Sequence, residues 1–238
     1  MIRSSIALLM LLVAISLPAA PLLLDSGERQ VTLLELYTSQ GCSSCPPAER
    51  WLDRYADDND LWTELVPVAF HVDYWDYLGW QDTYAVPAHG ERQRDYARAG
   101  RTSTVYTPGF FANGREWRGW TFGLGPRQSD RQPGNLVAVI DAGRISASFP
   151  AAVEPLELHV ALLGFGIETP VAQGENRGRT LSQSFVVLRH VVHDSDNGQW
   201  QVDLPQVRAG QTQRRAIALW VSTRDNPAPL QATGGWLP

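Results

Sequence analysis

Two short apolar segments in the first half of the chain have the pattern of buried strands. Residues 31–37 (VTLLELY) and 65–72 (LVPVAFHV) are almost continuously apolar and are bounded by polar residues. Between these segments stand Pro46 and Pro47, followed by apolar residues at helical spacing. Adjacent prolines fit only the first turn of a helix, because the N–H groups that they lack have no partner there. We therefore predict a strand, a helix that begins at Pro46, and a second strand.

A charged helix and a hairpin are predicted to complete this first part. Residues 88–99 have the pattern of a charged helix, and Asn113 and Gly114 form a strong hairpin-turn signal. The order strand, helix, strand, helix, hairpin is typical of an α/β domain. We expect this domain over residues 28–124.

Strict alternation of apolar and polar residues dominates the second half of the chain. Residues 123–135 have the composition of a linker, being rich in glycine, proline and polar residues. Beyond them, alternation is clear over residues 156–162, 200–204 and 217–221. About six short strands in this region suggest a β-sandwich. The predicted fold is therefore an α/β domain followed by an all-β domain over residues 135–238.

The N-terminus has the pattern of an export signal. Arg3 precedes an apolar run over residues 6–17, and small residues follow up to residue 20. The run is short for a membrane span, so residues 1–20 are predicted to be a cleavable signal peptide, with an uncleaved anchor as the alternative. We expect a periplasmic or secreted protein with no other membrane segment.

Composition excludes several classes of function. The formal net charge is −5 and there is no basic block, so no nucleic-acid partner is expected. The chain contains no lysine, which excludes lysine Schiff-base chemistry and a Walker-type phosphate loop. Neither methionine follows the predicted signal segment, so a copper site with thioether ligands is excluded from the mature chain.

The two cysteines of the chain, Cys42 and Cys45, carry the candidate chemistry. A disulfide between them closes a very small loop and constrains the unfolded chain little, so it is a poor structural staple. They lie where the first strand passes into the first helix. Unpaired N–H groups and the dipole at a helix N-terminus favour a thiolate. We expect Cys42 to be the exposed attacking thiol and Cys45 the more buried resolving thiol.

Other roles for this pair remain open at this stage. A Cys-x-x-Cys spacing also supplies half of many zinc sites, and His71 is a further candidate ligand with Cys42 and Cys45. A permanently closed structural disulfide is another alternative. His71 and Asp73 either tune the thiols or form hydrogen bonds within the core, and the aromatic block from His71 to Tyr84 either lines a substrate groove or belongs to that core.

The strand, the dithiol and the proline-capped helix together resemble the thioredoxin-like superfamily. In that superfamily a proline, usually cis, lies against the dithiol, and Thr107 and Pro108 match this feature. The resemblance implies that Pro108 leaves a backbone edge free where a substrate chain can pair. It also implies a buried carboxylate in the first strand that helps to deprotonate the resolving cysteine. Glu35 is the candidate. The alternative for Glu35 is a structural pair with an arginine.

Longer motifs resemble an uncharacterised family of bacterial secreted proteins with a thioredoxin-like core. The resemblance covers about residues 31–119, and residues 174–178 (GENRG) also match. The matching segments are LELYTSQGCSSCPPA, AFHVDYWDYLGWQDTYAVP, ERQRDYA and VYTPGFFANG.

The function expected from the sequence is that of an exported thiol–disulfide oxidoreductase that needs no cofactor. Its substrate would be a protein or small-molecule thiol or disulfide, and a second partner would recycle the pair. The alternative is a metal-binding or partner-binding module in which Cys42 and Cys45 act as ligands or as a sensor.

Overall fold

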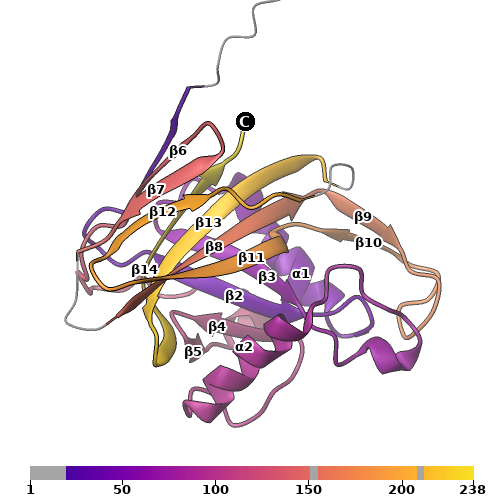
Figure 1. The fold of residues 1–238 in the computed structure, drawn as a ribbon. Coiled ribbons are helices and arrows are strands. Elements are labelled where there is room, and N and C mark those ends of the chain that lie inside the picture. The colour runs from indigo at the N-terminus through magenta and orange to yellow at the C-terminus, as the bar shows by residue number, and fades with distance from the viewer. Residues whose placement is uncertain (1–19, 151–154, 208–211) are drawn as a thin grey trace, which may run out of the picture.

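Strands from both halves of the chain join in one eight-stranded sheet in the computed structural model, which describes residues 20–150, 155–207 and 212–238. The predicted signal segment therefore lies outside the described residues, apart from Ala20. The strand order is β14-β13-β8-β11-β3-β2-β4-β5 (Figure 1). Its strands are β2 (Thr32–Thr38), β3 (Leu65–His71), β4 (Gly109–Ala112), β5 (Arg115–Glu116), β8 (Leu156–Phe165), β11 (Val186–Ser195), β13 (Arg214–Thr223) and β14 (Asn226–Trp236).

A parallel contact between β3 and β11 joins the two halves of this sheet. Val186 pairs with Ala69, and the Ala69 N–H donates a hydrogen bond of 2.8 Å to Phe185 O. One hydrophobic cluster also combines residues of both halves, among them Phe70 and Trp220. The predicted fold, a thioredoxin-like α/β domain followed by a separate β domain, is therefore wrong. The protein is mainly β, because the second half extends the sheet that the first half begins.

A second sheet of four strands packs on the larger one. Its order is β1-β6-β7-β12, and the N-terminal strand β1 (Leu22–Asp25) is paired antiparallel with β6. Its other strands are β6 (Val137–Asp141), β7 (Arg144–Ser148) and β12 (Gln199–Asp203). A second apolar cluster combines Ile145 and Trp200 of this sheet with Leu158 of β8. Strands β6 and β7 pair antiparallel as a hairpin that turns at Ala142 and Gly143.

A two-stranded ribbon stands apart from both sheets. It consists of β9 (Ile167–Pro170) and β10 (Thr180–Gln183), which pair antiparallel. Figure 1 shows this ribbon beside α1, on the side away from the four-stranded sheet. Alternation alone did not reveal these short strands, nor did it reveal β1 and β14.

Two α-helices lie on opposite faces of β2. Helix α1 (Pro46–Asp53) begins at the predicted proline, and α2 (Pro87–Arg98) begins one residue before the predicted range. Thr38 of β2 bonds to α1, whereas Glu35 bonds to α2. The two residues are three positions apart, so the alternation of side chains along a strand puts them on opposite faces. The 3₁₀ turns are η1 (Arg54–Asp57), η2 (Asp76–Leu78) and η3 (Gly119–Phe122).

Neither of these helices, nor any 3₁₀ turn in the described part of the chain, has the length and hydrophobicity needed to cross a membrane.

A buried ion pair fixes α2 to the sheet. Arg92 Nε lies 2.7 Å from Glu35 Oε1, and the Tyr96 hydroxyl donates a hydrogen bond of 2.5 Å to Glu35 Oε2. Arg92 also donates hydrogen bonds to the Tyr96 hydroxyl and to the carbonyl oxygen of Pro227, near the start of β14. Glu35 is fully buried. The arginine partner that the sequence left as an alternative for Glu35 is therefore the arrangement in the structure.

We predict that Glu35→Ala costs about 3–5 kcal/mol of unfolding free energy, because it leaves the Arg92 guanidinium buried without a counter-charge. Urea unfolding followed by circular dichroism measures this loss. The double variant Glu35→Leu/Arg92→Met removes both charges and should recover most of it. A loss below about 1 kcal/mol for Glu35→Ala would show that the pair does not hold α2 in place.

Candidate functional site

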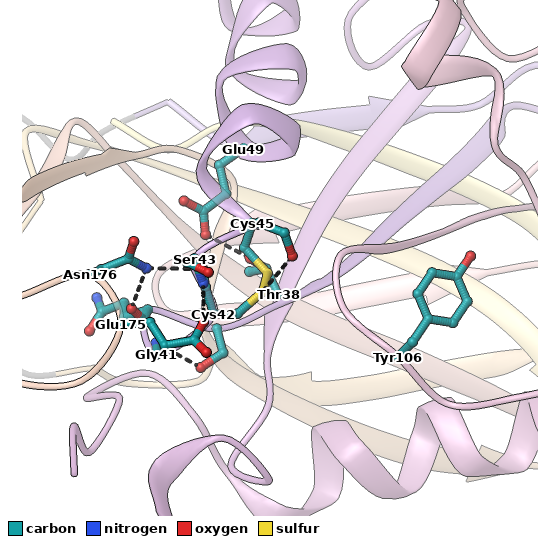
Figure 2. The surroundings of a disulfide bond; sticks show 12 residues. Thr38, Gly41, Cys42, Ser43, Cys45, Glu49, Tyr106, Glu175 and Asn176 are labelled. Atoms are coloured by element: carbon teal, nitrogen blue, oxygen red, sulfur yellow. Dashed lines mark hydrogen bonds between the residues drawn. A yellow bond between two sulfur atoms is a disulfide. The ribbon is translucent and has the colours of Figure 1, made fainter. Parts of the chain in front are cut away.

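The two cysteines form a disulfide in the loop between β2 and α1. Their Cα atoms are 5.5 Å apart, and Cys45 is the N-cap residue of α1 (Figure 2). Pro46 and Pro47 occupy the first two helical positions. The pair thus lies at the strand-to-helix junction where the sequence places it.

Both cysteine side chains are fully buried, while Ser43 and Ser44 between them are exposed. The expectation that Cys42 is exposed is therefore wrong. Its sulfur lies 3.3 Å from the hydroxyl oxygen of Ser44. Because both cysteine side chains are buried, a reaction partner needs a local rearrangement to reach either sulfur atom.

The free N–H groups near the disulfide are fewer than a helix N-terminus usually offers. Pro46 and Pro47 contribute none. The Cys45 N–H donates to Cys42 O at 3.2 Å, and the Ser43 N–H donates to Glu175 Oε2 at 3.0 Å. The expected stabilisation of a Cys42 thiolate by unpaired N–H groups is therefore weaker in this closed state than the sequence suggested.

A buried carboxylate, that of Glu49, lies on the same side of the sheet as the disulfide. Glu49 stands four residues after Cys45, so both lie on one side of α1. Its Oε1 accepts hydrogen bonds from Thr38 Oγ1 at 2.7 Å and from Gln183 Nε2 at 2.8 Å. Figure 2 shows its carboxylate directed toward Thr38 and the disulfide. Burial raises the pKa of Glu49, and its hydrogen bonds and His71 offset this only in part.

A buried histidine–aspartate pair lies next to this carboxylate. His71 Nδ1 is 2.7 Å from Asp82 Oδ2. Burial lowers the pKa of His71, but the charges of Asp82 and Glu49 outweigh it, so the pKa is raised. Burial raises the pKa of Asp82, but His71 and the backbone N–H groups of Gln40 and Tyr84 outweigh it, so the pKa is lowered. The His71 Nε2 atom is buried and has no hydrogen-bond partner within the described residues.

Gln40, two residues before Cys42, connects the dithiol loop to distant segments. Its backbone N–H donates to Asp82 Oδ2 at 2.8 Å, and its side-chain oxygen accepts from Trp80 Nε1 at 3.1 Å. Its side-chain nitrogen donates to Gln183 Oε1 at 3.0 Å and to Thr169 Oγ1 at 3.2 Å. Gln40 is fully buried, so these bonds hold the loop within the structure.

Thr107 and Pro108 lie at the edge of the sheet from which the dithiol loop leaves. They form a cis peptide bond, as the resemblance implied, and are half-buried. Gly109, the first residue of β4, pairs with Tyr37 of β2. Thr107 and Pro108 thus directly precede the residue of β4 that pairs with Tyr37, and the position of Pro108 against the dithiol stays a prediction.

The other sequence candidates are placed differently. Glu35 lies on the opposite face of β2 from Glu49 and does not belong to this site. Asp73 lies in the loop after β3, not on the strand with His71. The metal alternative required Cys42, Cys45 and His71 as ligands, yet the cysteines are bonded to each other and His71 to Asp82. No group of three or more potential metal ligands comes together in the described ranges.

Sequence reasoning missed the residues that surround the disulfide, namely Gln40, Glu49, Asp82 and Asn176. The spacing of Glu49 from Cys45 was a usable signal, because residues four apart meet on a helix. Asp82 and Asn176 lie in segments that carry the family resemblance, but no local pattern gave them a role, since both reach the site from distant segments.

Comparisons with known proteins give a family and two similar structures. The family model described as a protein of unknown function, DUF1223, matches residues 33–222. A crystal structure of a protein from Agrobacterium tumefaciens matches with a TM-score of 0.60 and 24% identity, over 87% of this chain and 95% of that one. HBP35 of Porphyromonas gingivalis matches with a TM-score of 0.57 and 14% identity, over 89% and 76%. These likenesses show the fold, and no curated protein matches.

We predict that Glu49→Gln changes how stability depends on pH. The folded-state pKa of Glu49 is raised, so its stabilising contribution is complete below the unfolded pKa and is lost as the pH rises through the folded one. The variant lacks this loss and should gain stability relative to the wild type as the pH rises above 4.5, the ordinary pKa of a glutamate.

Urea midpoints of the two proteins across this range make the comparison. Asp53, whose pKa burial raises to about 6 with a further contribution from Glu49, titrates in both proteins. Parallel pH profiles would contradict the assignment of a raised pKa to Glu49.

Proposed function

The chain belongs to this protein family of unknown function, and we propose that it is a thiol–disulfide oxidoreductase that reacts through Cys42 and Cys45. One observation carries the proposal: its two cysteines form a disulfide beside a buried carboxylate at the start of a helix. Such a short bridge adds little stability. A buried carboxyl group with a raised pKa costs stability, and such groups cluster at functional sites.

The reaction that this pair performs is a two-step exchange. In the reducing direction, the Cys42 thiolate attacks one sulfur of a substrate disulfide, and the other substrate sulfur leaves as a thiolate. The Cys45 thiolate then attacks the Cys42 sulfur, which releases the second substrate sulfur and forms the Cys42–Cys45 disulfide. The substrate gains two electrons and two protons, and the protein loses them. The reverse sequence oxidises a substrate dithiol.

In this scheme Glu49 is the general base that accepts the proton of Cys45. Cys45 must lose a proton before it attacks, and water has little access to a fully buried thiol. Glu49 is four residues away on the same helix, and its raised pKa suits proton exchange near neutral pH. The charge of the nearby His71–Asp82 pair can adjust to the proton on Glu49, since all three groups interact electrostatically.

The local arrangement supports a relation to the thioredoxin-like superfamily at this site, although the overall fold differs. This likeness rests on strand β2, the Cys-x-x-Cys loop, the helix that begins at Pro46 and the cis Thr107–Pro108 bond before β4. We carry over from this likeness a thiol or disulfide as substrate and a second protein that recycles the pair. Action in the periplasm or outside the cell belongs to the same proposal, because disulfides persist there.

The roles of the two sulfurs give a direct test. Cys42→Ser should abolish reduction of insulin disulfides, because no attacking thiolate remains. Cys45→Ser should instead accumulate a mixed disulfide between Cys42 and the substrate, visible by mass spectrometry without reductant. Full insulin-reductase activity in Cys42→Ser would refute the proposal.

The two buried carboxylates give a second, matched test. Glu49→Gln should lower the rate at which Cys45 resolves a mixed disulfide by about 10²-fold or more, as loss of a general base does. Glu35→Gln, on the other face of β2, should leave this rate within about twofold, although it lowers stability. Stopped-flow measurement on folded protein compares them, and equal effects of the two substitutions would remove Glu49 from the reaction.

A further inference from the structure

The turn between β9 and β10 lies against the dithiol loop. This turn, residues 171–179, is here called the cap. Its Asn176 is fully buried and donates through Nδ2 to Gln40 O and to Cys42 O, both at 2.9 Å. Its Glu175 accepts from the Ser43 N–H at 3.0 Å. The cap therefore binds the backbone on both sides of Cys42, on the side of the loop away from Tyr106 (Figure 2).

The cap is a folded unit rather than a loose loop. The Val171 N–H donates to Arg179 O at 2.9 Å, and the Gly178 N–H donates to Val171 O at 2.8 Å. Arg179 also donates to Asn176 Oδ1 at 3.0 Å, which fixes the orientation of the amide. These bonds lie within the cap, so it can leave the dithiol loop without losing its own structure.

The groups that the cap presents are those of a peptide backbone. Glu175 supplies an acceptor and Asn176 a donor, and they bond to the N–H of Ser43 and the carbonyl oxygen of Cys42. An extended polypeptide offers the same alternation of C=O and N–H groups to a chain that it pairs with. A substrate segment that replaced the cap would satisfy both backbone groups and bring its own cysteine next to Cys42.

Opening the cap would also act on the general base, Glu49. Gln183, the last residue of β10, donates to Glu49 Oε1, and its own oxygen accepts from Gln40. Movement of the β9–β10 ribbon therefore removes one of the two donors that stabilise the Glu49 carboxylate. A Glu49 with fewer donors binds a proton more readily. Substrate entry and proton acceptance are thus linked through one glutamine.

We propose that the cap is a displaceable cover that shields Cys42 and Cys45 from reaction partners. An extended polypeptide that bears a cysteine or a disulfide takes its place. The inference rests on the proposed function for the class of reaction. Whether the cap shields the disulfide can be tested without measuring catalytic activity. The carboxylate of Glu175 adds a second effect, because a negative charge at Ser43 N disfavours a thiolate on Cys42.

The test measures how fast the Cys42–Cys45 disulfide opens in the full chain. Oxidised protein is mixed with excess dithiothreitol, or with an unstructured peptide that carries one reduced cysteine, and is quenched with an alkylating reagent for mass spectrometry. Asn176→Ala removes both donor bonds, and Glu175→Ala removes the acceptor. Glu175→Gln keeps an acceptor oxygen and is the matched control.

Both alanine variants should open at least about tenfold faster with either thiol, and Glu175→Gln should stay within about threefold of the wild type. Unchanged rates with both thiols would overturn the cover. Acceleration with dithiothreitol alone would overturn the polypeptide as substrate. Because Glu175 is exposed, Glu175→Ala should fold, and it still tests the proposal if the buried Asn176→Ala variant does not fold. Faster opening without turnover on insulin would instead refute the proposed function and leave the cover intact.

Discussion

The hydrogen bonds of the buried Gln40 are the constraint on which the rest of the site depends. A buried loop outside regular structure cannot satisfy its own polar groups, so other segments must supply partners. Gln40 bonds to Asp82 and Trp80 before α2 and to Gln183 in β10. These partners come from both halves of the chain. The disulfide is thus held by contacts that form only when the whole molecule folds, which agrees with one shared sheet rather than two domains.

The two buried carboxylates near β2 differ because their partners differ. Glu35 faces Arg92 and two tyrosine hydroxyls, so its charge is balanced within the core. Glu49 receives only neutral donors, Thr38 and Gln183. A carboxylate with neutral donors in a buried place binds a proton more readily than one paired with a guanidinium. This difference gives Glu35 a balanced charge within the core and supports the proposed role of Glu49 in proton transfer.

Local patterns predicted the local structure well. The apolar runs gave β2 and β3, the paired prolines gave the start of α1, and the short spacing gave the disulfide. What failed was long-range. The contact of β3 with β11 rests on one residue pair about 120 positions apart, which periodicity cannot reveal. The prediction that Cys42 is exposed failed for the same reason, since Asn176 reaches the Cys42 backbone from a distant turn. The sequence left two roles open for Glu35, because both faces of β2 are buried and the sequence does not show which face meets α1.

The reduction potential of the Cys42–Cys45 pair tests the central claim most directly. Equilibration of the full chain in glutathione or dithiothreitol redox buffers, followed by alkylation and mass spectrometry, gives this value. An exchange catalyst requires a potential within about −120 to −270 mV, where the pair can pass electrons to and from cellular partners. A potential below about −300 mV would mean a permanently closed structural disulfide and would contradict the account.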